Sequence, residues 1–192
     1  MLKKIKKISM ATLFGLILVN LSGCLTTAVV TTAAVATKVA TDPRTAGRQL
    51  DDETLEEKVA IQLSSDAQLY QEARINVVAY NGKVLLIGQA PSEEAKVAAT
   101  RLADGLPGVK SINEIRIGPK IGLAQITKDG LITTEIKSKL LINSQVKATN
   151  VKVITENGEV FLMGHLTEQQ ANAAARVASY VKGVTKVVKV IN

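Results

Sequence analysis

Cysteine, histidine and tryptophan are almost absent from this chain of 192 residues, which has one cysteine, one histidine and no tryptophan. One cysteine excludes an internal disulfide. The one histidine has no second histidine or cysteine near it to share a metal ion. Aromatic residues make up only 3% of the chain, which leaves few rings to stack on bases. We therefore expect no metal, no cofactor and no nucleic acid partner.

The segment before the only cysteine has the order of a bacterial secretory signal. Its lysines come first, an uncharged apolar run from Ala11 to Val19 follows, and small residues end it. The last four residues, "LSGC", resemble the lipobox that the lipoprotein signal peptidase cleaves. We therefore expect residues 1–23 to be a signal peptide. Cys24 should then carry a diacylglycerol thioether, with a further acyl chain such as palmitate on its freed amine, and several chains anchor a protein stably.

Two other interpretations of this segment are weaker. A buried free cysteine would need globular sequence around Cys24, and a spanning helix from Ala11 through Ala40 would need an apolar run of about 20 residues. Leu25 follows the cysteine, where in gamma-proteobacteria an aspartate favours retention in the inner membrane. We therefore expect a lipid anchor in the outer membrane, facing the periplasm, an oxidising compartment that suits a chain with no second cysteine.

Residues 24–50 are rich in Ala, Thr and Val and carry no helical stripe of apolar residues. We expect this stretch to be the lipidated N-terminus and a flexible tether. The alternative, that part of it packs onto the folded part, remains open from the sequence.

The net charge of the chain comes largely from its signal. The chain has 24 basic and 17 acidic residues, and four of the lysines lie before the apolar run. The chain without its signal therefore has a net charge of only +3. This weak charge removes the main argument for nucleic acid binding.

The remainder of the chain is an internal repeat. The segment "YNGKVLLIGQAPSEEAKVAA" from Tyr80 matches "ENGEVFLMGHLTEQQANAAA" from Glu156, 76 residues later. Downstream, "LPGVKSINEIRI" matches "VKGVTKVVKVIN" after a gap of one residue. We expect two domains, at 51–118 and 128–192, joined by a linker at 119–127.

Each copy predicts the order helix, strand, strand, helix, strand. In the second copy Asp129 is the expected N-cap of a helix that buries Ile132, Ile136 and Leu140. An Asn-Gly pair predicts a hairpin. Thr167 and Gln170 predict a capping box for a crossover helix with an alanine stripe. The first copy predicts a helix over about 92–102 and a strand over about 111–117. The fold class is therefore α+β, with a three-stranded mixed sheet on two helices in each domain.

This order and the placement of the glycines resemble the BON domain. A lipobox followed by two such domains is similar to the dual BON-domain lipoproteins of the outer membrane, and the resemblance covers essentially the whole chain. It implies no enzymatic activity, a role in envelope integrity, and contact with phospholipid through the second domain.

No residue pattern indicates an active site. Gly82, Gly88, Gly158 and Gly164 lie at the hairpins and at the ends of the second strands, where a positive φ or a close backbone approach explains them. His165 lacks a catalytic partner in the sequence and is expected at the surface. Three acidic pairs are expected at helix starts, where the helix dipole favours negative charge: Asp51-Asp52, Glu56-Glu57 and Glu93-Glu94.

The two copies carry opposite charge. Residues 51–118 have seven basic and eleven acidic residues, a net charge of −4, and residues 128–192 have nine basic and five acidic, a net charge of +4. This contrast favours contact between the second copy and anionic lipid, where a surface lysine contributes about 1 kcal/mol. Attraction between the two copies, or solubility, is the alternative explanation.

The first helix of the second copy is the expected lipid contact. If its apolar stripe faces the sheet, Leu131 lies about 100° away from that stripe, near lysines. We expect lipid contact from this set of residues: Leu131, Ile132, Glu135, Lys137, Ser138 and Lys139. An alternative is that Leu131 only packs at the helix start. Close members of the family carry a tryptophan at this position, and leucine lacks the interfacial preference of an indole.

The sequence thus favours a non-enzymatic, lipid-anchored periplasmic protein whose second domain binds anionic phospholipid such as phosphatidylglycerol. Its role would be envelope integrity, including at the division site. The alternative is a protein-interaction adaptor that docks an outer-membrane assembly or cell-wall machine, with the lipid serving only for location. A hydrolase would require a carboxylate beside His165 and is the weakest hypothesis.

Overall fold

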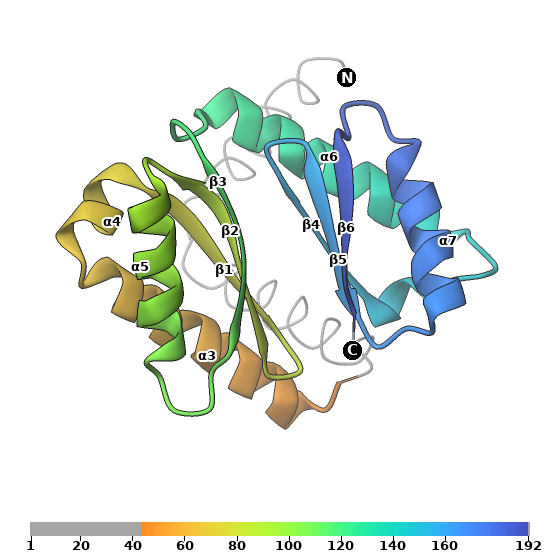
Figure 1. Cartoon of the computed structure of the whole chain (residues 1–192). Coiled ribbons are helices and arrows are strands. Elements are labelled where there is room, and N and C mark those ends of the chain that lie inside the picture. The colour runs from red at the N-terminus through yellow and green to blue at the C-terminus, as the bar shows by residue number, and fades with distance from the viewer. Residues whose placement is uncertain (1–43, 192) are drawn as a thin grey trace, which may run out of the picture. The chain divides into compact units, whose positions relative to one another are not determined.

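The computed structural model describes residues 44–191, which form two modules of the same design (Figure 1). The first module contains α3 (Ala46–Ser64), α4 (Ala67–Glu72), β1 (Arg74–Tyr80), β2 (Lys83–Ala90), α5 (Glu93–Asp104) and β3 (Ser111–Ile117). The second contains α6 (Leu123–Leu141), the 3-10 turn η2 (Ala148–Asn150), β4 (Val151–Glu156), β5 (Glu159–Gly164), α7 (Glu168–Ser179) and β6 (Lys186–Ile191). The predicted order of elements is confirmed, and the short α4 and η2 are additions to it.

Each module has one three-stranded sheet, in the orders β1-β2-β3 and β4-β5-β6. The first two strands pair antiparallel through a hairpin, and the last strand pairs parallel with the central one. Helices α5 and α7 connect the parallel strands, and with α3 and α6 they cover one face of each sheet (Figure 1). The predicted α+β class, with a mixed sheet on two helices, is therefore confirmed.

The crossover helices begin at the predicted side-chain caps. Ser92 accepts a hydrogen bond from the N–H of Ala95. Thr167 and Gln170 form a full capping box, in which each side chain accepts from the other residue's N–H. Small buried residues line the sides of α5 and α7 that touch the sheets: Ala95, Ala99 and Ala103 in the first module, and Ala171, Ala174 and Ala178 in the second.

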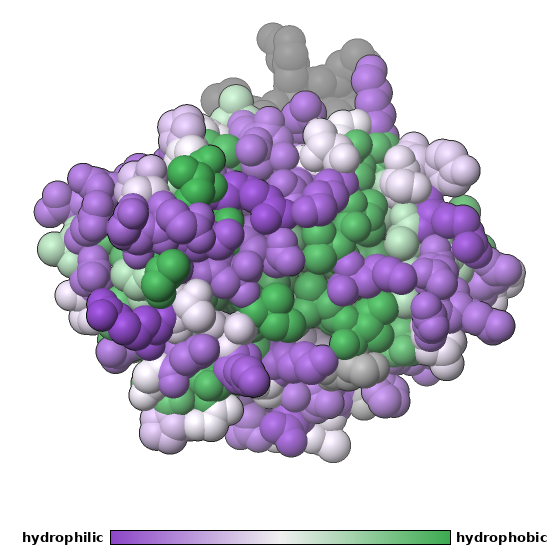
Figure 2. Space-filling model, viewed as in Figure 1, coloured by the Kyte–Doolittle hydropathy of each residue, from purple (hydrophilic) through white to green (hydrophobic). Residues whose placement is uncertain are grey.

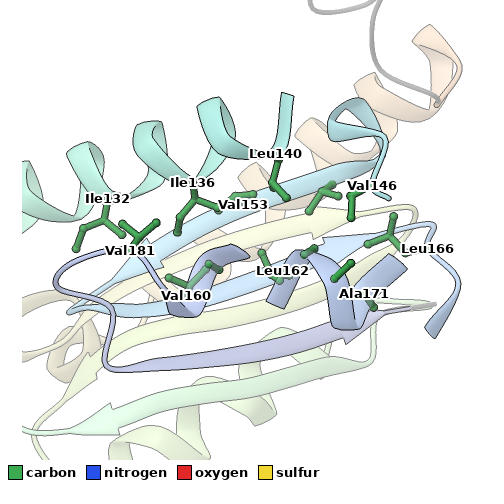
Figure 3. Packing of buried hydrophobic residues seen from close by; sticks show 14 residues of the cluster. Ile132, Ile136, Leu140, Val146, Val153, Val160, Leu162, Leu166, Ala171 and Val181 are labelled. Atoms are coloured by element: carbon green, nitrogen blue, oxygen red, sulfur yellow. The ribbon is translucent and has the colours of Figure 1, made fainter. Parts of the chain in front are cut away.

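A separate apolar core lies between the sheet and the helices of each module. Figure 3 shows the core of the second module, where side chains from α6 point toward side chains of the sheet. The facing residues are Ile132, Ile136 and Leu140 from the helix, and Val153, Val160 and Leu162 from the strands. The predicted apolar stripe of this helix is therefore its buried face.

Asp129 was expected at the N-cap of α6, and this prediction is wrong. The helix begins at Leu123, with Gly122 as its N-cap, so Asp129 lies inside it. Its carboxylate is buried and accepts the backbone N–H groups of Asn157 at 2.7 Å and Gly158 at 2.9 Å. The aspartate thus attaches the helix to the β4–β5 turn, and these two bonds, with a third from the side chain of Gln125 at 2.8 Å, satisfy the buried charge.

Asp52 has the same role in the first module. Its carboxylate accepts from the N–H groups of Asn81 at 2.7 Å and Gly82 at 2.8 Å, and Arg44 donates to it at 2.5 Å. Both turns have the backbone of a type I′ hairpin, because the asparagine and the glycine have positive φ.

Both first helices begin before the expected domain limits. Helix α3 starts at Ala46 and α6 starts at Leu123. Residues 46–50, assigned to the tether, and residues 123–127, assigned to the linker, are therefore helical. The connection between the modules shortens to residues 118–122.

Close backbone contacts explain two of the glycines singled out from the sequence. A Cβ atom on Gly88 would lie 1.9 Å from the carbonyl oxygen of Arg74, and one on Gly164 would lie 2.2 Å from that of Asn150. Both contacts come from the neighbouring strand of the hairpin or the residue before it. Only glycine, which has no Cβ atom, lets the two strands of the hairpin approach this closely.

The sheet faces that the helices leave uncovered pack against each other. A buried cluster joins Val78, Tyr80, Leu85 and Ile87 of the first module to Phe161, Met163 and Val190 of the second. Strands β2 and β5 are buried on both faces, since alternate side chains contact the helices and the other sheet. Figure 2 shows hydrophobic residues in a band along the middle of the face in view, bordered by hydrophilic residues.

Polar side chains cross this interface at the end of β4. The carboxylate of Glu156 is buried, with 5% of the residue exposed, and it accepts from Arg74 at 2.5 Å and from Gln89 at 2.8 Å. The oxygen of Gln89 accepts the N–H of Ile121 in the connection. The buried charge therefore has partners, and the network joins both modules to their connecting segment.

Two further ion pairs cross the interface. Arg116 donates two hydrogen bonds to Glu159, at 2.8 and 2.6 Å, which lower the pKa of the Glu159 carboxyl and raise that of the Arg116 guanidinium. Lys152 donates to Glu56 at 2.8 Å. The pairs run in both directions, with basic residues contributed by each module. Two of the three pairs, Arg74–Glu156 and Arg116–Glu159, place the basic residue on the first module, opposite to the net charges of the two copies.

Candidate functional site

The outer face of α6 holds five of the six residues predicted to contact lipid. Leu131, Glu135, Lys137, Ser138 and Lys139 are exposed. Ile132 is different, because it is only 4% exposed and packs in the core of the second module. Its side chain faces the sheet, so any surface on this helix is built from the other five residues and their neighbours.

Large apolar side chains are exposed along the length of α6. Leu131 is 68% exposed, and Leu123 near the start and Leu141 at the end are exposed to a similar degree. At about 100° per residue, these three leucines lie on the side of the helix away from Ile136. Ile142, just after the helix, is also exposed. Several large exposed apolar residues on one element are more than the scattered surface leucines of an ordinary soluble domain.

The polar residues between these leucines have hydroxyl groups that are hydrogen-bonded to the helix backbone. Three hydroxyls donate to carbonyl oxygens one turn earlier in the helix: Thr127 to Leu123 at 3.0 Å, Thr134 to Gly130 at 2.9 Å and Ser138 to Thr134 at 2.9 Å. A hydroxyl that is already bonded to the backbone loses less on leaving water than an unbonded one. We call this set the α6 strip: Leu123, Thr127, Gly130, Leu131, Thr134, Ser138 and Leu141.

Lysines border the α6 strip on both sides. By helical geometry Lys137 lies on one side of it, and Lys128 and Lys139 lie on the other. All three are exposed, and Lys139 lies 3.5 Å from Glu135 in an exposed i,i+4 pair. Such an exposed pair contributes only about 0.3 to 0.5 kcal/mol, so it leaves Lys139 available to a stronger anionic partner. The surface is an uncharged strip with basic margins.

The fold removes most acidic groups from the surface of the second module. Of its five acidic residues, Asp129 is buried under the hairpin turn, and Glu156 and Glu159 pair with arginines of the first module. Glu135 and Glu168 remain exposed. Among the nine basic residues of this module, Lys152 pairs with an acidic residue of the first module, Glu56. The outer surface is therefore more basic than the net charge of +4 indicates.

His165 is exposed at the end of β5. Within residues 44–191, no group of three or more His, Cys, Asp or Glu residues could hold a metal ion. The grooves found there are open, and one of about 530 Å³ runs between α7 and the start of β6.

The predicted lipid anchor depends on a residue near the start of the chain. Cys24, the expected lipidation site, lies outside the described residues. Among the residues that the structure does describe, no helix has the length and hydropathy of a membrane span.

Sequence reasoning missed the residues that fix α6 in place and join the modules. Asp129 and Asp52 were assigned to helix starts, yet each binds a turn almost 30 residues away. The repeat carried a signal for this, because both copies place an aspartate about 29 residues before the Gly of the hairpin. Glu156 and Glu159 flank that turn in the second copy alone, and their partners come from the other module.

Comparisons with known proteins match both modules. A family model described as the BON domain matches residues 51–119 and 128–192. The 21 kDa hemolysin of Actinobacillus pleuropneumoniae is 68% identical over 152 residues, which are 79% of this chain and 78% of that protein. The outer membrane lipoprotein DolP of Haemophilus influenzae is 54% identical over 190 residues, 98% of this chain and 95% of that protein. Osmotically-inducible protein Y of Escherichia coli is 30% identical over 161 residues, 82% of this chain and 80% of that protein.

Proposed function

The chain belongs to the BON-domain family, and from that premise we propose that it is a lipid-anchored protein of the outer membrane that binds anionic phospholipid through α6. It faces the periplasm and supports the integrity of the envelope, including at the division site. It works by binding and not by catalysis.

Its location is supported from two directions. A relative that matches 98% of this chain is described as an outer membrane lipoprotein. The sequence "LSGC" before Leu25 has the form of a lipoprotein cleavage site, with Cys24 as the residue that takes the lipid. Acyl chains on that cysteine would hold the protein at a leaflet without a spanning helix.

The observation that carries the lipid proposal is the composition of the α6 strip. Its leucines offer apolar area, and the bonded hydroxyls of Thr127, Thr134 and Ser138 lower the cost of bringing that area into the headgroup region. The bordering lysines would meet anionic headgroups, at about 1 kcal/mol each near the surface. An amphipathic surface helix of this kind lies in the plane of a membrane interface.

A weak contact suffices for a protein that is already anchored. Attachment through Cys24 would make binding of α6 effectively intramolecular, with an effective concentration of about millimolar for a short flexible linker. Three lysines and three leucines therefore need only modest affinity for α6 to occupy the leaflet most of the time.

The test uses residues 42–192, which form a compact unit containing both cores. This fragment, without its acyl anchor, is titrated with vesicles of phosphatidylglycerol and phosphatidylcholine, or of phosphatidylcholine alone, while backbone NMR shifts are followed. We expect shifts from Leu123 to Leu141 only with phosphatidylglycerol, and we expect them to weaken with salt.

A matched pair of variants separates charge from folding. Replacing Lys128, Lys137 and Lys139 by glutamine should abolish the shifts, whereas replacing Lys58, Lys96 and Lys110 of the first module should leave them unchanged. Equal shifts with both vesicle types, or none with either, would contradict the proposal. The chain would then be better explained as an adaptor for a protein of an outer-membrane assembly or cell-wall machine.

A further inference from the structure

The turn after α7 holds an exposed tyrosine in a fixed place. Tyr180 is 85% exposed, Val181 is buried and Lys182 is exposed. Backbone hydrogen bonds fix this turn, from Val181 to Ala178 at 3.1 Å and from Val184 to Val181 at 3.2 Å. Because Val181 is inserted in the core, the residues on either side of it are held outward.

This turn lies against the first half of α6. Val181 belongs to the same core cluster as Ile132, and Figure 3 shows the two side chains next to each other. A Cβ atom on Gly183 would lie 3.1 Å from Cδ1 of Ile132 and 3.3 Å from Cε of Lys128. The aliphatic stem of Lys128 therefore rests on the turn, on the side of α6 that leads to Leu131.

The side chain of Tyr180 has no evident role in the fold. It caps α7 through its backbone, whose N–H bonds to Ala178, and any residue could supply that group. The other aromatic residue of the second module, Phe161, is 1% exposed between the sheets. Exposing the apolar ring of a tyrosine to water is unfavourable in free energy. The headgroup region of a membrane accommodates both the ring and the hydroxyl.

We infer that Tyr180 and Lys182 form a second contact with the anionic leaflet, continuous through Lys128 with Leu131 of the α6 strip. This inference rests on the proposed function of α6 and names residues outside that helix. Tyr180 supplies the aromatic anchor at headgroup depth, and Lys182 meets a lipid phosphate. Two contact elements fix the tilt of the module on the membrane, which one helix does not do alone.

The absence of tryptophan from the chain allows a direct test. Tyr180→Trp in the fragment 42–192 introduces a single indole, whose emission is recorded with phosphatidylglycerol vesicles that contain brominated phosphatidylcholine. We expect a blue shift and quenching by the bromine atoms. Tyr70→Trp, at an exposed position on α4 of the acidic module, is the control and should show neither.

A second measurement avoids the affinity that an added indole brings. Tyr180→Ser should weaken vesicle binding of the fragment by roughly three- to tenfold, the loss expected for one interfacial side chain, while Tyr70→Ser should not change it. Leu131→Trp reports on α6 independently. Quenching at position 131 without quenching at position 180 would overturn this inference and leave the proposed function standing. Absence of binding by the unmodified fragment would overturn both.

Discussion

Asp129 in α6 and Gly158 in the β4–β5 turn are joined by a 2.9 Å hydrogen bond from the glycine N–H to the buried carboxylate. The bond sets the rotation of the helix about its own axis, because Asp129 has to face the turn. Once Asp129 faces inward, Leu131 and Thr134 must face outward. The same contact that closes the hairpin therefore presents the α6 strip to the exterior.

Replacing Asp129 by asparagine should destabilise the protein by about 1 to 3 kcal/mol. The amide keeps the size of the carboxylate but replaces one of its two acceptor oxygens with an NH2 donor, which then faces one of the two backbone N–H groups. Urea denaturation of the fragment 42–192 measures the change. Asp52→Asn should have a comparable effect in the first module, and Asp104→Asn at an exposed site should cost less. An unchanged midpoint for Asp129→Asn would contradict this account of the turn.

Replacing Glu156 by alanine should uncouple the two modules. The change leaves Arg74 and Gln89 without their shared acceptor inside the interface, at a cost of about 3 kcal/mol. Calorimetry should then show two unfolding transitions instead of one. Glu168→Ala, at an exposed site on α7, is the control and should leave one transition. A single transition at the original temperature for both variants would show that the apolar contacts alone join the modules.

The pair of Arg116 and Glu159 should make stability depend on pH. The pKa of Glu159 is lowered, chiefly by the hydrogen bonds from Arg116. A carboxyl whose pKa is lower in the folded chain stabilises that chain above its unfolded pKa of about 4.3, and this stabilisation is lost as the pH falls through the folded value. The free energy of unfolding should therefore fall more steeply below about pH 4.3 for the unmodified fragment than for Glu159→Gln. Parallel curves would contradict this assignment.

Two glycine substitutions should have opposite signs. Gly164→Ala would place its Cβ 2.2 Å from the carbonyl oxygen of Asn150 and should cost more than about 2 kcal/mol, since backbone must move. Gly130→Ala, in the interior of α6 with open space around it, should stabilise by about 0.5 to 1 kcal/mol. Thermal unfolding of the two variants measures both effects. A loss of stability for Gly130→Ala would show that this position of the α6 strip is not open.

Local signals in the sequence were enough for the elements of each module. The Asn-Gly turns, the capping box at Thr167 and the strand Ser111–Ile117 all depend on neighbouring residues, and the structure has them where they were expected. The start of α6 was misplaced, because Asp129 has the chemistry of an N-cap and its true partner is distant in sequence. A local pattern does not distinguish these two uses of one carboxylate.

The contact between the two sheets has a signature in the sequence of their central strands, which was not interpreted above. The runs "KVLLIG" and "EVFLMG" are apolar at consecutive positions, whereas a strand with one solvated face alternates. Such runs predict burial on both faces.

The register of the last strands could not be read from the repeat. Sequence matching aligns Lys189 with Glu114, but strand pairing aligns it with Asn113, since both face the same position of the central strand. Only the sheet itself fixes that one-residue difference.

The packing of the sheets back to back has an electrical consequence. Helices α3 and α6 cover opposite outer faces, so residues 44–117, with a net charge of −2, and residues 123–191, with a net charge of +4, lie on opposite sides of the contact between the sheets. Opposite charges at a fixed separation make a permanent dipole, which a negatively charged leaflet turns before any contact forms. The acidic module would be directed away from the leaflet and α6 toward it. The protein would thus arrive at the membrane already oriented.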